Sequence, residues 1–293
     1  MSLHTPNEER QARLAPVLGS TSGGQAMARN SRALLVTVLG EFARPNGGSA
    51  WTQTLIDAMG LVGVTEKATR QILVRLDERG WLDRSRDGRR TRWHLTDASR
   101  QLLDEGAERI YRHGRDERGW DGRWSVLLAS VPDGGGDRHG LTVGLKWAGY
   151  GPLGHATWIS PWVDREVEAA RTVGSAGVVG ATSFVAEIGA LGDGADLAAR
   201  AWDLEAIAST YREFTRWLHD RDGDEPTVAL RSLTETVHRW RRFPLVDPQL
   251  PYELLPDDWP GADAANAFAE ARTRWRAGAD DWWLDREARY GPH

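Results

Sequence analysis

The sequence predicts a multidomain α+β protein with three parts: helices followed by a β-hairpin, a small mixed α/β layer, and a helical C-terminal part. The chain has 293 residues, more than one domain usually holds. Its hydrophobic periodicity changes from helical to alternating strand and helix, and then back to helical. Two segments rich in glycine and charge, His113–Gly119 and Gly189–Gly194, separate the parts. We therefore expect a flexible tail over 1–27 and domains over 28–113, 120–190 and 195–293.

The composition is that of a globular protein. Hydrophobic residues make up 40% of the chain and charged residues 27%, and no apolar run is long enough to span a bilayer. The N-terminus lacks the basic-then-apolar pattern of a signal peptide. Cysteine is absent, which excludes disulfides, thiolate metal sites and cysteine nucleophiles. We expect a cytoplasmic protein that makes no membrane contact.

The first three helices are predicted from apolar spacing and from their end signals. Ser31–Phe42 is amphipathic, and Thr52–Met59 stops at a glycine. Thr65 is a good N-cap for the third helix, and Gly80 supplies the left-handed residue that ends it. Apolar residues recur on one face of this third helix, so the opposite face is free to contact a ligand or solvent. The opposite face and its flank carry Lys67, Thr69, Arg70, Gln71 and Arg75.

An arginine-rich β-hairpin is predicted next. Two alternating runs flank Asp87-Gly88, a dipeptide typical of two-residue hairpin turns in which both central residues take positive φ. The ribbon is basic, with Arg84, Arg86, Arg89, Arg90 and Arg92. A helix capped by Thr96 follows, to about Tyr111. Residues 27–113 hold 15 basic and 11 acidic residues, against 22 and 31 in the rest of the chain, so the positive balance lies here.

Helix, turn, helix, hairpin and helix, in this order, is the plan of a winged helix, in which one helix enters the major groove and the hairpin grips the DNA beside it. The side chains of the exposed helix face are donors of the kind that contact phosphates and base edges. The alternative is that this basic surface is merely solvated. We predict DNA binding through Thr65, Lys67, Thr69, Arg70, Gln71, Arg75, Arg86, Arg89, Arg90 and Arg92.

The middle part alternates strands and helices. Strand-like segments are predicted at Trp124–Val131, His155–Ile159 and Val178–Ile188, with helices at Asp137–Trp147 and Asp164–Val173 between them. This β-α-β-α-β order is compatible with a ferredoxin-like α/β layer that has its helices on one face.

The C-terminal part is predicted to be helical over Leu197–His219, Thr227–Arg241 and Gly261–Arg289. Phe243–Pro256, between the last two helices, is too rich in proline for a regular element. Because it alternates proline with large apolar residues, we expect an ordered, partly buried segment, which we call the proline clasp.

Catalytic motifs are absent from the sequence. There is no phosphate-binding loop, no nucleophile elbow and no zinc-binding helix motif, and the histidines lack ligand spacing. We therefore expect no catalytic residue, metal site or cofactor, and no enzyme activity. One alternative is a metal-dependent nuclease acting through Asp121 and Asp133 of the middle domain. A third reading, a protein that only binds partner proteins, predicts no operator binding at all.

Five stretches together resemble the PaaX family of bacterial repressors, which control aromatic-acid degradation such as the phenylacetate pathway. They are Ser31–Phe42 with Arg44-Pro45 and Gly47-Gly48, the Arg70–Trp81 helix end, Trp120–Trp124, Trp158–Pro161, and the long run from Trp240 to Gly261. The resemblance covers Met27 to the C-terminus. It departs from the family in the long N-terminal tail and in the tryptophan-rich middle part.

The resemblance implies a winged helix, a ferredoxin-like middle domain similar to a CRISPR-associated nuclease subunit, and a helical C-terminal domain. It also implies a homodimer on a double-stranded DNA operator and an aryl-CoA thioester, such as phenylacetyl-CoA, as effector. A pocket for such a thioester would join basic side chains to aromatic walls. The residues that offer both are Lys146, Trp147 and Trp158 in the middle part, and Arg241 and Arg242 beside the proline clasp.

Overall fold

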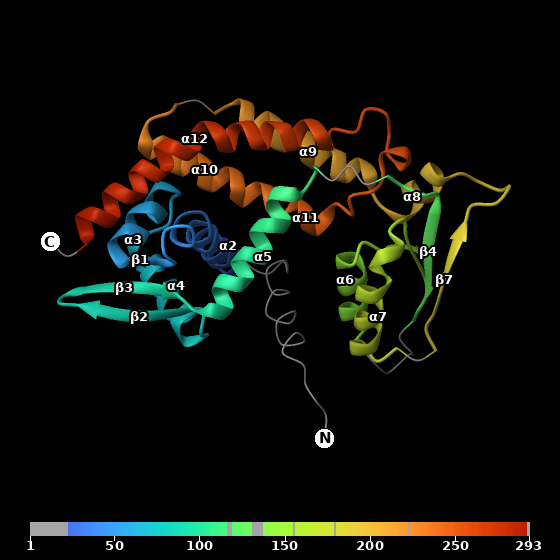
Figure 1. Ribbon diagram of the computed structural model, residues 1–293, viewed down its shortest axis with the longest axis horizontal. Coiled ribbons are helices and arrows are strands. Elements are labelled where there is room, and N and C mark those ends of the chain that lie inside the picture. The colour runs from blue at the N-terminus through green and yellow to red at the C-terminus, as the bar shows by residue number, and fades with distance from the viewer. Residues whose placement is uncertain are drawn as a thin grey trace, which may run out of the picture. The chain divides into compact units, whose positions relative to one another are not determined.

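The computed structural model describes residues 23–115, 119–130, 137–154, 156–178, 180–221 and 223–291 (Figure 1). The chain divides into two compact units. Unit 1 comprises Met1–Glu108, Arg221–Arg239 and Glu270–His293, and unit 2 comprises Arg109–Asp220 and Trp240–Ala269. The division into domains at 28–113, 120–190 and 195–293 stays a prediction.

Unit 1 begins with helices and a small sheet. Its N-terminal elements are α2 (Gly23–Val38), the π-helical turn η2 (Leu39–Ala43), β1 (Ser49–Trp51), α3 (Thr52–Leu61), α4 (Glu66–Glu78), β2 (Leu82–Asp87), β3 (Arg90–Leu95) and α5 (Asp97–Arg112), of which the last four residues belong to unit 2. The predicted helices are all present. Because α2 begins at Gly23, the end of the predicted tail is helical instead. The rest of that tail, 1–22, lies outside the described residues.

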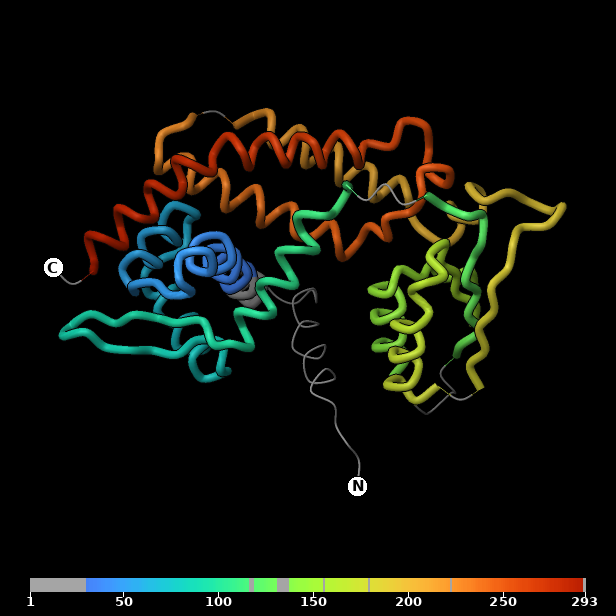
Figure 2. Tube along the Cα trace, in the orientation of Figure 1, coloured from blue at the N-terminus to red at the C-terminus, as the bar shows by residue number. Residues whose placement is uncertain are grey.

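The three strands form an antiparallel sheet in the order β1-β3-β2, and β2 and β3 extend together as a ribbon (Figure 2). The predicted turn is wrong by one residue. Asp87 pairs with Arg90, so the loop is Gly88-Arg89, and only Gly88 of these has a positive φ, of 55°. A glycine at the first central position is one of the two common solutions for a two-residue hairpin loop.

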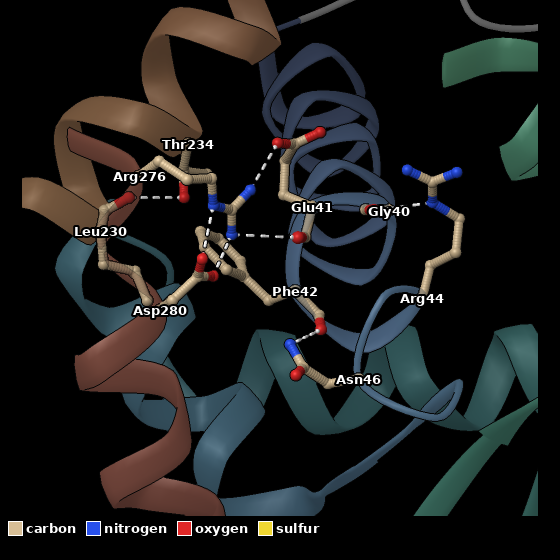
Figure 3. A network of polar contacts seen from close by, with 9 residues as sticks. All are labelled: Gly40, Glu41, Phe42, Arg44, Asn46, Leu230, Thr234, Arg276 and Asp280. Carbon is tan, nitrogen blue, oxygen red and sulfur yellow. Dashed lines mark hydrogen bonds and ion pairs between the residues drawn. The ribbon is translucent and has the colours of Figure 1, made fainter. Parts of the chain in front are cut away.

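The end of α2 is widened into the π-helical turn η2. Side chains donate hydrogen bonds to backbone carbonyl groups of this turn (Figure 3). Arg44 Nε donates to the Gly40 carbonyl at 3.1 Å, and the Asn46 amide donates to Phe42 at 2.8 Å. The Glu41 carbonyl accepts from Arg276 at 3.3 Å. One of these donors lies in the C-terminal helix, more than 200 residues away in the chain.

Two C-terminal helices complete the core of unit 1. They are α10 (Pro226–Trp240) and α12 (Gly261–Tyr290), each of which also contributes residues to unit 2. Trp283 of α12 is fully buried and stacks on Phe42 with ring centroids 5.4 Å apart. Part of the predicted helical C-terminal region therefore packs against the N-terminal helices. The apolar periodicity of each helix does not reveal that Phe42 and Trp283 contact each other.

Unit 2 contains a four-stranded antiparallel sheet in the order β5-β6-β4-β7. Its elements are β4 (Arg123–Leu128), α6 (Arg138–Trp147), β5 (Gly151–Gly154), β6 (Thr157–Ser160), η3 (Val163–Arg165), α7 (Glu166–Ser175) and β7 (Thr182–Glu187). The predicted β-α-β-α-β order is present, with the glycine-flanked strand β5 in addition. A strand of four residues containing a proline and two glycines gives too little β signal to be found from sequence.

Alternate residues of β4 enter two different cores. Leu127 packs with Leu145 of α6 and Ala169 of α7 on one face, where Figure 1 shows both helices beside the sheet. Trp124 packs on the other face with Leu250 and Leu254 of the proline clasp. The period of two along the strand produces this division.

The second face of the sheet is covered by α8 (Gly194–Ala201), and α9 (Leu204–His219) follows after a break at Trp202. The sequence predicts a single helix here.

The proline clasp is ordered and buries Leu250 and Leu254, as predicted, but it does contain regular turns, α11 (Phe243–Val246) and η4 (Tyr252–Leu254). Pro244 lies in the first turn of α11, where the missing N–H costs nothing. No helix among the described residues is both long and apolar enough to cross a membrane.

Candidate nucleic-acid interface

Helix α4 separates its apolar and polar residues onto opposite faces. Thr65 caps it as predicted, its side chain accepting from the Ala68 N–H at 3.3 Å, and Gly80 after the helix has a φ of 69°. Ile72, Leu73 and Leu76 are buried. Of the residues predicted to bind DNA, Thr65, Lys67, Arg70, Gln71 and Arg75 are exposed. Five of the six residues predicted from this helix therefore lie on an accessible surface.

Thr69 is the exception, and its predicted DNA contact is wrong. The residue is 0% exposed, and its hydroxyl donates to the Thr65 carbonyl at 3.1 Å. Thr69 lies three, four and seven residues before Ile72, Leu73 and Leu76, so the helical period places it on the core face. Its polarity suggested a surface role, but a short hydroxyl that bonds to its own helix can be buried at little cost.

Arg70 is oriented by a neighbour on its own helix. Its Nε donates to Glu66 at 2.8 Å, and both side chains are more than half exposed. An exposed pair with this spacing contributes only about 0.3–0.5 kcal/mol. The guanidinium group is therefore steered by Glu66 but can exchange this partner for a base or a phosphate.

Val74 belongs to the same exposed face and was missed from the sequence. It is 43% exposed and follows Lys67, Arg70 and Gln71 at spacings of seven, four and three residues. An exposed valine has no donor or acceptor, which is why donor chemistry did not select it. The one apolar group on the edges of the bases in the major groove is the thymine methyl.

The arginines of the hairpin have different surroundings. Arg86 and Arg89, at the tip, are exposed and have no ion-pair partner among the described residues. Arg84 is also exposed and approaches Asp77 of α4 at 3.4 Å, a contact that joins the ribbon to the helix. The tip therefore presents two available guanidinium groups.

Arg90 and Arg92 both have partners within the protein, although Arg90 is exposed and Arg92 is partly exposed, and their DNA contacts stay a prediction. Arg90 donates to the carbonyl groups of Tyr290, at 3.1 Å, and of Gly291. Arg92 donates to Ser49 at 3.0 Å, lies 5.1 Å from the centre of the Trp51 ring, and is 3.5 Å from Glu287. Three of these partners, Glu287, Tyr290 and Gly291, lie at or just after the C-terminal end of α12, about 200 residues away in the chain.

The residues predicted to bind an effector lie on separate elements of unit 2. Lys146 is exposed at the end of α6, whereas Trp158 of β6 is 8% exposed and packs in the core beneath α6. Trp147 is faced by the guanidinium group of Arg109 at 4.2 Å. Such a stack can hold a tryptophan ring in place.

The two arginines that follow α10 differ in burial. Arg242 is exposed, whereas Arg241 is largely buried. Burial, and to a smaller degree the charge of Arg242, lower the pKa of the Arg241 guanidinium. Arg242 is thus the accessible cation of the pair.

The acids proposed for a nuclease do not form a metal site in the described part of the chain. Asp121 accepts from Arg123 at its backbone N–H, at 3.0 Å, and at its Nε, at 2.8 Å. The hydrogen bond from the Arg123 side chain is the main reason that the pKa of Asp121 is lowered. Asp133 lies outside the described residues, and within them no group of three or more potential ligands is arranged to hold a metal ion.

A buried polar network that the sequence does not reveal lies in unit 2. His113, expected in a linker, is 2% exposed, and its Nε2 is 2.7 Å from the Tyr211 hydroxyl. Tyr211 donates to Asp247, whose Oδ2 is 3.6 Å from the His113 ring nitrogen. Burial lowers the pKa of His113, against the opposing effect of the Asp247 charge. Because the three residues come from distant segments, no local pattern could have linked them.

Comparison with protein-family models gives three matches along the chain. They are "PaaX-like protein" over residues 30–99, "PaaX protein central Cas2-like domain" over residues 117–198, and "PaaX-like protein C-terminal domain" over residues 202–285. The central part of this mixed, mostly helical α/β protein is thus a Cas2-like domain.

Individual relatives agree with these matches. The "Transcriptional repressor PaaX" of Escherichia coli (strain K12) is 31% identical over 254 residues, which cover 82% of this chain and 78% of that protein. A solved structure of an uncharacterised protein from Mycobacterium tuberculosis superimposes with a TM-score of 0.59. It covers 86% of this chain and 98% of its own at 24% identity, which shows that the two share a fold.

Proposed function

The chain belongs to the PaaX family, and on this basis we propose that it is a DNA-binding transcriptional repressor of an aromatic-acid catabolic operon of the phenylacetate type. The observation that carries the proposal is the exposed polar face of α4 together with the basic hairpin tip. Both lie in the segment that matches the first family model. A repressor of transcription acts at the chromosome, which also supports a cytoplasmic location.

We interpret the N-terminal elements as a winged helix. α3 and α4 would form the helix-turn-helix, with α4 in the major groove, and β2 and β3 would form the wing. The order of elements and the three-stranded sheet support this assignment. In this arrangement Lys67, Arg70 and Gln71 meet base edges, and Arg86 and Arg89 meet the sugar-phosphate backbone.

We interpret the central part as a ferredoxin-like layer that does not act as an enzyme. Its strand order, β5-β6-β4-β7, and the two helices between its strands fit the split βαβ plan. Asp121 is occupied by Arg123, so the nuclease alternative has no support from this residue. A fold shared with Cas2 does not by itself imply catalysis.

We propose that the active species is a homodimer on a two-fold operator. A single winged helix buries a modest area of DNA, on the order of 600–1,000 Å². Two copies related by a two-fold axis would contact two half-sites and add their affinities. The proposal is contradicted if the protein sediments as a monomer and this monomer binds one half-site with a Kd on the order of nanomolar, the affinity of full specific binding.

The effector that we propose is an aryl-CoA thioester such as phenylacetyl-CoA. Among the predicted residues, Lys146 and Arg242 are accessible cations that suit phosphate groups, and Trp147 is a partly exposed ring that suits an aryl group. An effector releases DNA only if it binds the DNA-free state more tightly, and tenfold release requires about 1.4 kcal/mol of difference.

The effector proposal is tested by titrating phenylacetyl-CoA while following tryptophan fluorescence and operator binding. We expect the thioester to release DNA, and Arg242→Ala to weaken this response with operator affinity unchanged. If free phenylacetic acid releases DNA and no thioester does, a site for the CoA phosphates is not needed and the assignment of Arg242 fails.

The DNA-binding proposal is tested by genomic footprinting followed by binding of variants to the operator found. Replacing Arg86 or Arg89 with Ala should weaken specific and random DNA alike and reduce the slope of log affinity against log salt by roughly 1 for each phosphate contact. Replacing Arg70 or Gln71 should instead relax the preference at one base pair, at a cost of about 1–3 kcal/mol. If both classes of variant bind like the wild type, α4 and the hairpin do not form the DNA-binding surface.

A further inference from the structure

The last turns of α12 are fastened to the edge of the small sheet by Glu287. Its Oε1 accepts from the Trp51 backbone N–H at 3.0 Å, and its Oε2 lies 3.5 Å from Arg92. The Glu287 side chain is 14% exposed. β1 is an edge strand, so the Trp51 N–H that points outward would otherwise be left to solvent. One carboxylate therefore joins β1, β3 and α12.

The same end of the helix also fixes the hairpin through Arg90. This guanidinium group donates to the carbonyl of Tyr290, the last residue of α12, and to that of Gly291 directly after it. Carbonyl groups at a helix C-terminus have no partner within the helix and carry partial negative charge, which suits a cation. Because Arg90 directly follows the hairpin loop, this contact lies near the tip and not at the root of the ribbon.

A third set of contacts reaches the helix-turn-helix. The Tyr290 hydroxyl donates to Asp57 of α3 at 2.8 Å, and Arg286 lies 3.6 Å from the same carboxylate. The helix pair and the hairpin are thus bound to one segment, Arg286–Gly291. A two-stranded ribbon is marginally stable by itself and depends on such packing for a fixed direction.

We propose that the segment Arg286–Gly291, at the C-terminal end of α12, is a positioning element of the DNA-binding surface, with Glu287 as its principal residue. It sets the direction of the hairpin relative to α4, so that Arg86 and Arg89 reach the phosphates while α4 lies in the groove. Arg90 and Arg92 affect DNA binding by holding the hairpin in this position, and they do not contact the DNA. The inference rests on the proposed function.

The test compares Glu287→Ala and Glu287→Gln with Glu270→Ala, a matched control that removes an exposed glutamate from the same helix. Each full-length variant is titrated with operator and random DNA over a series of salt concentrations, and its thermal midpoint is measured. We expect Glu287→Ala to weaken both DNAs roughly tenfold and to reduce the salt slope by about 2, the contribution of two phosphate contacts. Glu287→Gln, which keeps an acceptor for Trp51, should lie between, and Glu270→Ala should match the wild type.

The base preference distinguishes a positioning role from a general loss of structure. A displaced hairpin leaves the preference encoded by α4 unchanged, whereas partial unfolding lowers the thermal midpoint and the active fraction. Should Glu287→Ala fail to fold, Tyr290→Phe removes only the bond to Asp57 and should weaken both DNAs to a smaller extent.

Two results would overturn the inference. Tighter DNA binding by Glu287→Ala would mean that α12 withholds Arg90 and Arg92 from DNA, and wild-type affinity with a wild-type salt slope would mean that the contacts serve packing alone. Failure of the proposed function is a separate outcome, in which the wild-type protein itself shows no operator preference.

Discussion

Arg276 joins the C-terminal helix α12 to the π-helical turn, and its replacement with Leu should destabilise unit 1 strongly. The guanidinium group lies 3.3 Å from the Glu41 carboxylate and also bonds Asp280 and the Glu41 carbonyl, while covering the Phe42 ring at 5.1 Å (Figure 3). Glu41 is only 6% exposed. Removing one partner from such a pair leaves a poorly solvated charge, at a cost of about 3 kcal/mol.

Urea denaturation of a double-mutant cycle measures this directly. Glu41→Gln in the background of Arg276→Leu removes the buried charge that has lost Arg276, so the double variant should recover part of the stability and show a large coupling energy. The control is Arg274→Leu on the same helix, whose pair with Asp224 is 44% and 67% exposed and should cost about 0–1 kcal/mol. If Arg276→Leu costs no more than Arg274→Leu, Glu41 is solvated or otherwise paired, and α12 is not anchored by this contact.

Three further predictions concern other sites. Burial lowers the pKa of His113 in the folded protein below its usual 6.5. Below pH 6.5 the His113 side chain of the unfolded chain takes up a proton before that of the folded protein does. The contribution of His113 to the free energy of unfolding is therefore complete above pH 6.5 and is lost as the pH falls from there toward the lowered pKa. His113→Gln should flatten this loss, measured as urea midpoints between about pH 7 and pH 5. Thr69→Val should keep operator affinity, whereas Arg70→Ala should lose about 1–3 kcal/mol in a gel-shift titration. Operator DNA with uracil in place of one thymine should bind the wild type less tightly by about 0.8 kcal/mol, the value of a buried methyl group. Val74→Ala should show a smaller penalty, and equal penalties at every thymine would exclude a methyl contact.

The local features of the candidate site could be predicted because short-range physics determines them. The apolar spacing of Ile72, Leu73 and Leu76, the cap at Thr65 and the stop at Gly80 each depend on residues within two helical turns. The same spacing already places Thr69 on the buried face. Its hydroxyl favours a surface position, but the helical period decides its burial.

The shift of the hairpin turn shows where local reasoning stops. Asp87-Gly88 is a good turn dipeptide by itself. The register that places Arg92 opposite both Ser85 and Trp51 moves the loop to Gly88-Arg89. A loop at Asp87-Gly88 would shift the pairing of β2 and β3 by two residues and place Leu82 opposite Trp93 instead of Leu95, so the pairing along the whole ribbon outweighs a turn preference.

The sequence by itself determined the order of the N-terminal helices and the hairpin, the exposed polar face of α4 and the basic character of the ribbon. Only the tertiary structure decided which arginines remain available, since Arg90 and Arg92 are held by Glu287, Tyr290 and Gly291 from the far end of the chain. A guanidinium group bonds any well-placed carboxylate or carbonyl, and chain folding alone decides which of them comes within reach.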